Sequence, residues 1–512
     1  MRSTFMGLEA SKRGLFTQQS ALYTTGHNIS NANTEGYSRQ RVNMSPTLGY
    51  PGIGLNAPKT AGFIGTGVQA ESVQRIRDSF TDMQYRQETN KLGYWEARSQ
   101  SITQMEDILN EPSDYGLAKS MDEFWNSLQD LNVNPKDGGA RAVVIQRGIA
   151  VADSFNYMYN SISQIKDNAG EEIGILLKDA NSILEQIASI NEQIQAIEPN
   201  GYMPNDLYDA RDVLLDQLSM YFPIETTKVE SGGNALAIAE GSITVSLKIN
   251  GNSVTLVDGK NYAKINISAN SRKTDGITPT GTVKGLEITN TEGVNEEVTI
   301  DKFNNLGKFK SLVDSYGYSN NGNEKGLYPE MIEKLNNMAQ EFATAFNSIH
   351  KDGFDLSGSN GQAFFVVKDS INETGITAGN IYVNQAIIDE PNLIAASDAA
   401  NEPGNGKQAL KLAKMKFDSL SGLDNVSVQT YFEGLIGQLG VDGQQAYRLA
   451  YNAQTLQQAV TERRASISSV SLDEEMTNMI SFQQAYNANA RMITVIDETL
   501  DKIINGLGRV GL

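Results

Sequence analysis

The chain has 512 residues, enough for about three domains, and 39% of its residues are hydrophobic, as in folded globular proteins. It carries 42 Lys and Arg against 61 Asp and Glu, a net charge of −19, and no basic segment stands out, which argues against a nucleic-acid partner. Because the chain has no cysteine, a disulfide framework, a zinc knuckle and thiol chemistry are excluded.

The first predicted element is an amphipathic helix within residues 1–30. Leu8, Leu15, Leu22 and Ile29 recur every seven residues, and the other expected seam positions are polar, so the apolar stripe is narrow. A single helix of this length is marginal in water and needs a second surface that covers its stripe. The segment has neither the apolar core nor the cleavage site of a signal peptide, so we expect a protein that stays inside the cell or leaves by a route that reads no cleaved signal. No apolar run approaches the roughly 20 residues that span a bilayer, and we predict no membrane insertion.

Turn-forming residues follow this helix. Residues 27–40 are rich in Asn, Ser, Thr and Gly, which bond to their own backbone and predict a compact loop. Gly and Pro punctuate the next stretch, where Val68–Ile76 is a predicted strand. Helical spacing then predicts helices over Asp78–Leu109 and over Ile173–Ile197, which Pro199 ends. We interpret the second helix as part of an intramolecular bundle and as a long rod segment.

The period of the apolar residues changes to two at about Ile224. Three runs, 243–249, 254–256 and 263–267, are separated by Asn-Gly and Asp-Gly turns and predict a three-stranded antiparallel meander. Helical spacing resumes near Tyr328 and continues, after a glycine-rich interval, to the end of the chain. This order favours nested layers, with both termini together at one end of a long molecule.

The last predicted element is a helix with the narrow stripe of a coiled-coil seam. The stripe consists of Leu472, Met479, Phe482, Tyr486, Asn489, Ile493, Ile496, Leu500, Ile503 and Leu507. The seam position of Asn489 has two interpretations, a buried amide that fixes the register or a side chain turned to solvent. Residues 1–50 hold five basic against two acidic side chains and residues 471–512 hold three against six, so the two ends should attract each other. No adjacent segment covers either stripe, and we interpret both as subunit-interface surfaces.

Several residue patterns typical of chemical sites have simpler structural interpretations. Two histidines without cysteine cannot supply a typical zinc shell. Residues 352–360 lack the correctly placed glycine and final Glu of a calcium loop, which favours an Asx turn, and residues 404–407 lack key residues of a phosphate loop. The adjacent acids Glu474 and Glu475 point about 100° apart on a helix and are interpreted as a solvated face. We predict no catalytic, cofactor or metal site.

The loop after the first helix resembles the signature of the flagellar axial proteins, the rod, hook and hook-associated subunits. The residues that carry this resemblance are Asn28, Ile29, Asn31, Ala32, Asn33, Thr34, Gly36 and Tyr37. Within that group, further segments are similar to the hook-associated protein 1 (FlgK) family, whose members form the first junction ring between hook and filament: 355–365, 382–384 with 394–397, and 471–476 with 483–490. The resemblance covers residues 1–220 and 325–512.

Membership of this family implies a structural subunit without enzymatic activity. It implies an extracellular position at the hook–filament junction, reached through the flagellar type III export apparatus without a cleaved signal peptide. The implied partners are further copies of the chain in a ring, the hook protein, a second junction protein next to the filament, and an export chaperone. The chaperone would bind the C-terminal helix, here at Tyr486, Ile493, Ile496, Leu500 and Ile503.

The predicted fold is mainly α with a β insert, in an elongated rod of nested domains. Residues 1–45 and 471–512 would pair as a coiled coil, residues 46–220 and 325–470 would form a helical bundle, and residues 221–324 an outer antiparallel β domain. One alternative is another axial subunit, such as a hook or distal rod protein. A less favoured alternative is a secreted enzyme with its activity in the insert, which lacks a base, a nucleophile and an orienting group together.

Overall fold

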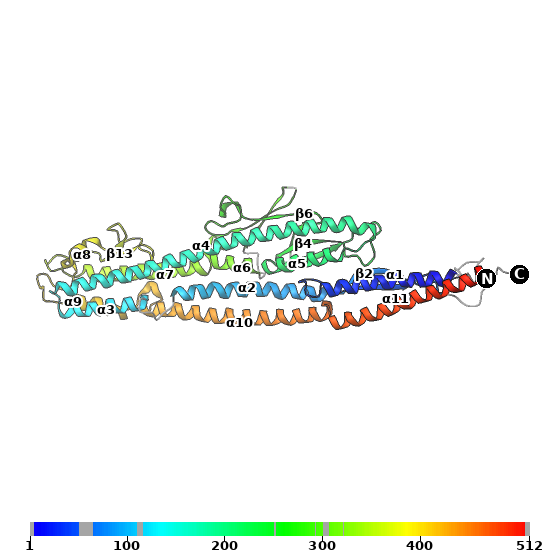
Figure 1. The fold of residues 1–512 in the computed structure, drawn as a ribbon. Helices are drawn as coiled ribbons and strands as arrows, with labels where there is room; N and C mark the ends of the chain where they lie inside the picture. The colour runs from blue at the N-terminus through cyan, green and yellow to red at the C-terminus, as the bar shows by residue number, and fades with distance from the viewer. Residues whose placement is uncertain are drawn as a thin grey trace.

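The structure is a computed structural model that describes residues 5–50, 65–109, 116–249, 252–291, 293–300, 307–320 and 322–506. The molecule is long and mainly helical, and its first and last helices lie together at one end (Figure 1). The α-helices are α1 (Phe5–Ser30), α2 (Ser79–Leu109), α3 (Leu117–Val133), α4 (Gly138–Ile197), α5 (Asn205–Tyr221), α6 (Lys308–Tyr316), α7 (Leu327–Lys351), α8 (Gln385–Asp389), α9 (Lys407–Lys414), α10 (Val428–Ser468) and α11 (Leu472–Asp501). The prediction of a mainly α fold with a β insert is confirmed.

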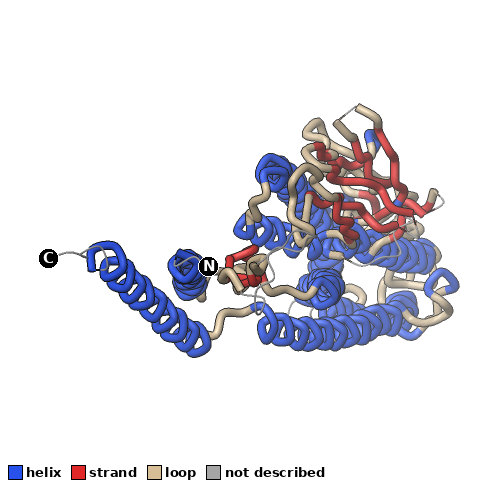
Figure 2. Tube along the Cα trace, turned by 90° about the vertical axis from the view of Figure 1, so that its right-hand side faces the viewer, coloured by secondary structure: helices blue, strands red, loops and turns tan. Residues whose placement is uncertain are grey.

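Within the described residues, the strands form five small antiparallel sheets. They are β1 (Gln40–Pro46), β2 (Val68–Arg75), β3 (Ile224–Val229), β4 (Ser242–Ile249), β5 (Asn252–Asp258), β6 (Asn261–Tyr262), β7 (Lys264–Ile267), β8 (Gly285–Thr289), β9 (Asn295–Thr299), β10 (Tyr318–Asn320), β11 (Asn323–Lys325), β12 (Phe365–Val367) and β13 (Ile381–Val383). Most of them belong to the insert, whose strands gather on one side of the helices (Figure 2).

Helix α4 is the longest element, with 60 residues and therefore a length of about 90 Å. It begins at Asp137, whose side chain accepts a hydrogen bond from Gly139 N, and it ends at the short 3₁₀ turn that contains Pro199. Its first half was not predicted, because small and polar residues interrupt the apolar stripe there. One of them, Gly148, is required by packing: a Cβ at this position would lie 2.8 Å from the ring of Phe364.

The core at the far end of the rod is aromatic. Phe124 of α3, Phe342 and Phe346 of α7, and Phe364 and Phe365 around β12 are all fully buried. The ring centroids of Phe124 and Phe346 are 5.2 Å apart, and those of Phe342 and Phe365 are 5.0 Å apart. Such ring pairs add to the stabilisation that burial of their area provides.

The described residues between 224 and 299 form two sheets instead of one meander. The sheet orders are β3-β4-β5-β6 and β7-β8-β9, so residues 264–267 pair with β8 and not with β5. The predicted third strand is therefore wrong in its partner. The physical reason lies in α4, where the Asn181 amide donates to Ile265 O at 2.8 Å and accepts from Ile265 N at 2.7 Å. This side chain takes the hydrogen bonds that a neighbouring strand would supply.

Helix α4 holds the first sheet in the same way. Its buried Asn191 donates to Ile243 O at 2.9 Å and accepts from Ile243 N at 3.2 Å. Both sheets of the insert are thus tied through side-chain amides to one rigid helix.

Two loops with candidate ligand residues have the geometry of turns. Asp355 Oδ1 accepts hydrogen bonds from the backbone N of Ser357 at 2.8 Å and of Ser359 at 2.9 Å, which is an Asx turn. Asn405 Oδ1 accepts from Lys407 N, the first residue of α9. Within the described ranges, three or more His, Asp or Glu side chains do not gather as metal ligands. The described helices also include none that is long and apolar enough to cross a bilayer.

Candidate assembly site at the terminal helices

Helices α1 and α11 lie side by side and antiparallel at the end of the rod (Figures 1 and 2). A Cβ built on Gly7 would lie 3.3 Å from Ile496 Cδ1, and a Cβ on Gly14 would lie 2.8 Å from Asn489 Oδ1. One step of seven residues forward on α1 therefore matches one step of seven residues back on α11. The glycines let the two helices approach closely at these two positions.

The structure brings most of the predicted α11 seam toward α1. The half-buried seam residues are Met479, Phe482, Tyr486, Asn489, Ile493, Ile496 and Leu500. Two predicted members lie outside the contact: Leu472 is 49% exposed and Ile503 is 46% exposed. Leu507 lies outside the described residues. On α1, Leu8, Leu15, Leu22 and Ile29 are also only half-buried.

The covered face of α1 is built from small and polar residues instead of leucines. Its buried residues are Gly14, Thr17, Ala21, Thr24, Thr25 and Asn28. Gly7, Gly14, Ala21 and Asn28 are seven residues apart and directly precede the predicted leucines. A search for apolar periodicity missed them, because a close helix contact requires small side chains and not large ones.

Asn489 fits neither of its two predicted environments fully. Its side chain is half-buried, lies against Gly14, and donates to Ala485 O of its own helix at 3.0 Å. Its role in fixing the register stays a prediction.

We expect Gly14→Leu to loosen the terminal helix pair. The new side chain would displace Asn489, and overpacking of this kind costs about 1–3 kcal/mol. Hydrogen exchange in α1 and α11 should accelerate accordingly in the isolated protein. Gly26→Leu is the matched control, because a Cβ at Gly26 meets no atom within 4 Å. Equal exchange rates in the two variants would contradict the register.

Asn28 joins the end of α1 to the following loop and to α11. Its Nδ2 donates to Gln40 O at 2.8 Å and to Glu475 Oε2 at 3.1 Å, and its Oδ1 accepts from Gln40 N at 2.9 Å and from Tyr37 OH at 2.8 Å. All four hydrogen-bonding positions of the amide are used, and the residue is 1% exposed. Asn28 is two steps of seven after Gly14, and Glu475 is two steps of seven before Asn489, so this pair has the same register as the two glycine contacts.

The other motif residues shape the loop. Asn31 Nδ2 donates to His27 O at 3.1 Å, and Thr34 Oγ1 donates to Asn31 Oδ1 at 3.2 Å. Gly36 has a φ of +78°, and a Cβ there would lie 2.1 Å from Val213 Cγ2 of α5, so a side chain fits neither the backbone nor the space. Ala32 is half-buried and Asn33 is exposed. The motif thus encodes a tight turn that packs on the rod.

The charges of the two termini meet at this turn. Arg39 Nε lies 2.7 Å from Glu475 Oε1, and Arg39 Nη2 lies 2.9 Å from Glu474 Oε1. Hydrogen bonds from Arg39 lower the pKa of Glu474 below its ordinary value. The interpretation of both acids as a solvated face is wrong for Glu475, which is 2% exposed. Its partner is 436 residues away in the sequence, so helix geometry alone did not reveal it.

A buried ion-pair network lies between this turn and the rod. We call it the basal network; it comprises Arg75, Arg77, Arg86, Arg464, Asp82, Asp209, Asp212, Asp216 and Glu240. Its members come from the β2 region, α2, α5, α10 and the segment that precedes β4. Ser38 N donates to Asp209 Oδ2 at 2.9 Å, which links the turn to the network.

Asp212 lies at the centre of the basal network. Its carboxylate is 2.8 Å from Arg75, 3.2 Å from Arg77 and 3.0 Å from Arg86. Burial would raise the pKa of Asp212, but the charges of these three guanidinium groups and of Arg211 outweigh it and hold that pKa well below the ordinary value. The carboxylate therefore stays charged and holds β2, α2 and α5 together.

Comparisons with known proteins decide the family. The family described as "Flagellar hook-associated protein FlgK helical domain" matches residues 102–365. A flagellar hook-associated protein 1 of Bacillus subtilis is 44% identical over 99% of each chain. The chain belongs to the flagellar hook-associated protein 1 family. A second member of this FlgK family, from Escherichia coli, is 25% identical over 96% of this chain and 98% of its own.

Two further comparisons fall on the terminal helices. Residues 8–37 match a family described as "Flagella basal body rod protein", and residues 463–506 match "Flagellar basal body rod FlgEFG protein C-terminal". These segments contain α1 with its turn and α11. The solved structure of the flagellar hook junction protein FlgK from Burkholderia pseudomallei shares the fold, with a TM-score of 0.61, 12% identity, and coverage of 75% of this chain and 100% of that one.

Proposed function

We infer that α1 and α11 are the assembly elements of a structural subunit at the junction between the flagellar hook and filament. The family of the chain supports a structural flagellar component without enzymatic activity. One observation carries the role of the helices: of the 30 residues of α11, only Glu475 is buried. None of its apolar side chains is fully covered by its own chain, and a helix this long obtains most of its stability from covering such side chains.

Large apolar side chains are exposed on both helices. They are Phe5, Phe16 and Tyr23 of α1, and Leu472, Met476, Ile480, Met492 and Val495 of α11. Covering each fully would stabilise an assembly by about 1.5–3 kcal/mol, before the cost of ordering. We propose that neighbouring copies in a ring, the hook protein and a second junction protein cover this surface.

Export would precede assembly. We propose a type III route without a cleaved signal and a chaperone that covers Tyr486, Ile493, Ile496, Leu500 and Ile503. Four of these side chains are half-buried against α1 in the structure, so the chaperone would have to compete with α1 for them. The protein would then be extracellular and joined to the flagellum.

We propose three nested domains: residues 1–45 with 471–512, residues 46–220 with 325–470, and residues 221–324. The position of the insert on one side of the helices supports an outward-facing third domain (Figure 2). The hydrogen bond from Ser38 N to Asp209, which ties the turn after α1 to the basal network, supports a stiff connection between the first two.

The test is a single charge in the seam. Ile493→Asp or Leu500→Asp should leave the rod folded, as judged by its thermal unfolding, and abolish the capping of purified hooks, because a buried carboxylate opposes the contact. Val133→Asp is the matched control, since Val133 is 73% exposed and ends α3, a helix at the opposite end of the molecule from α1 and α11 (Figure 1). Normal capping by both seam variants would contradict the assignment.

A further inference from the structure

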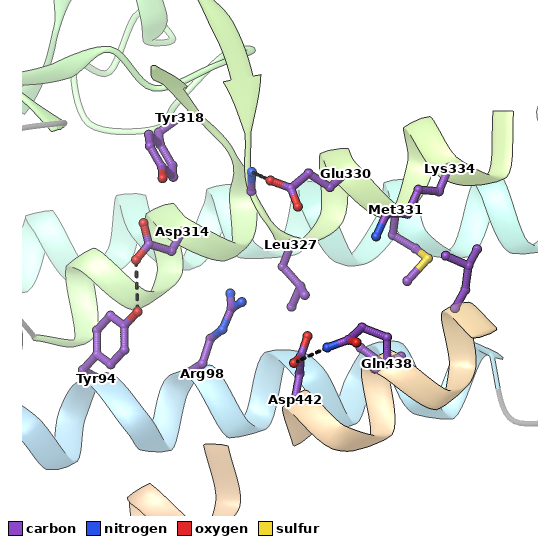
Figure 3. Close-up of a pocket in the computed structure, with 13 residues that line it drawn as sticks. Tyr94, Arg98, Asp314, Tyr318, Leu327, Glu330, Met331, Lys334, Gln438 and Asp442 are labelled. Atoms are coloured by element: carbon purple, nitrogen blue, oxygen red, sulfur yellow. Dashed lines mark hydrogen bonds between the residues drawn. The ribbon is translucent and has the colours of Figure 1, made fainter. Parts of the chain in front are cut away.

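A pocket of about 290 Å³ lies in the rod between α2, α7 and α10, beside α6 and β10 (Figure 3). Tyr94 and Arg98 reach it from α2, Asp314 from α6, and Glu330 from the first turn of α7. Gln438 and Asp442 reach it from α10, which packs along α2. The lining is mostly polar, which is unusual for a space between packed helices.

Arg98 is the unexplained group of this pocket. Figure 3 shows its side chain pointing into the pocket from α2. Its Nη1 atom is enclosed, and no described residue accepts a hydrogen bond from it. A guanidinium presents five donors in a planar fork that matches a carboxylate, and an enclosed donor without an acceptor is costly. The chemistry of Arg98 therefore calls for an acceptor with negative charge.

The carboxylates around the pocket already have partners of their own. Asp314 accepts from Tyr94 OH at 3.2 Å and pairs with Lys310, while Asp442 accepts from Gln438 Nε2 at 2.9 Å. Burial, with Asp314 nearby, raises the pKa of Tyr94 to about 12, so its hydroxyl remains a donor. Glu330 Oε1 accepts from Gly326 N at 3.3 Å, at the start of α7. Each carboxylate can accept further hydrogen bonds, because its two oxygens offer about four acceptor positions.

The pocket is lined by three carboxylates against two cations, Arg98 and Lys334, so its lining is negative on balance and an isolated anion is a poor ligand. A ligand that carries both charges suits both kinds of lining residue. Its carboxylate would pair with Arg98, and its ammonium group would pair with the carboxylates of the lining. We propose that this pocket binds a small zwitterion, a molecule of amino-acid size with one carboxylate and one ammonium group. This site is independent of the terminal helices and of their role in assembly.

The test uses ω-amino acids as a ruler. Glycine, β-alanine, γ-aminobutyrate and ε-aminocaproate separate the same two charges by increasing distances, while acetate and propylamine each carry one of them. We expect titration calorimetry on the full-length protein to show binding that is strongest at one chain length and weaker for both single-charge probes. Arg98→Gln should weaken this binding roughly ten- to a hundredfold, the effect of one charged hydrogen-bonding group. Asp442→Asn should also weaken zwitterion binding, because it removes a carboxylate that would pair with the ammonium group of the ligand.

Lys91→Gln is the matched control, because Lys91 is an exposed cation on the same helix outside the pocket. Arg98→Gln removes an enclosed donor without a partner, so we expect unchanged thermal unfolding, and a fold defect will not mask the result. Absence of binding of every zwitterion to the wild type, or equal binding to Arg98→Gln, would overturn the proposal. Impaired ring assembly by Arg98→Gln without zwitterion binding would assign the pocket to a subunit contact and overturn it as well.

Discussion

Asp212→Asn should destabilise the base of the rod by about 3–5 kcal/mol, the usual cost of removing one partner from a buried ion-pair network. Asp212 is 6% exposed and touches three guanidinium groups, which would keep their charges but lose their shared carboxylate. Native-state hydrogen exchange in β2 and α5 measures this loss locally, since a chain with several domains need not unfold in one step.

The matched control for Asp212→Asn is Glu171→Gln. Glu171 also pairs with a cation, Lys273, but its side chain is 59% exposed, so solvent screens the pair and it contributes little.

The acid dependence of stability follows from the lowered pKa of Asp212. The stabilisation that Asp212 provides is present above the unfolded-state pKa near 3.8 and is lost as pH falls through the lower native pKa. Equal effects of the two substitutions would show that the basal network is not a structural joint.

Acid should destabilise the far end of the rod through His350. This side chain is fully buried beside Phe346 and Phe364; Nδ1 donates to Gln362 O at 2.6 Å, and Nε2 accepts from Ala395 N at 3.0 Å. Burial lowers the pKa of His350 from 6.5 to about 4. The native state thus requires the neutral ring, whereas the unfolded chain binds a proton below about pH 6.5.

The loss of stability should be absent above pH 6.5, grow as pH falls from 6.5 to 4, and reach about 3 kcal/mol below pH 4. His350→Asn should unfold more easily at pH 7 and show a shallower loss of stability between pH 6.5 and 4. Phe346→Leu is the control, because it weakens the same aromatic cluster at every pH and keeps the titrating group. Calorimetric scans at several pH values separate the two patterns, and equal pH slopes in wild type and His350→Asn would contradict this account.

Local periodicity located the elements with a clear apolar stripe, missed α3, α5 and the first half of α4, and predicted contacts poorly. The alternating runs of the insert located strands β4 and β5, but the partner of β7 depends on Asn181, an amide on a helix about 80 residues earlier in the chain. The seam of α11 was visible because large apolar residues mark it. The matching face of α1 was not, because Gly7, Gly14 and Ala21 carry no apolar signal in a sequence pattern.

The ion pairs of the candidate site illustrate the same limit. The opposite charges of the two termini were visible in the composition, yet the sequence did not indicate that Arg39 would bury Glu475. The resemblance located Asn28 and Gly36 without giving a reason for them. The structure supplies a reason for each. Asn28 uses all its hydrogen-bonding positions. Gly36 has a positive φ and lies against Val213 of α5, and both features exclude a side chain.

Hydrogen exchange of the terminal helices, measured on the isolated subunit and again on the subunit assembled on hooks, tests the central claim most directly. We expect α1 and α11 to exchange much faster than α4 in the isolated subunit, since α11 buries only Glu475, and to become strongly protected on assembly while α4 stays protected in both states. Strong protection of both terminal helices in the isolated subunit, unchanged on assembly, would contradict the account.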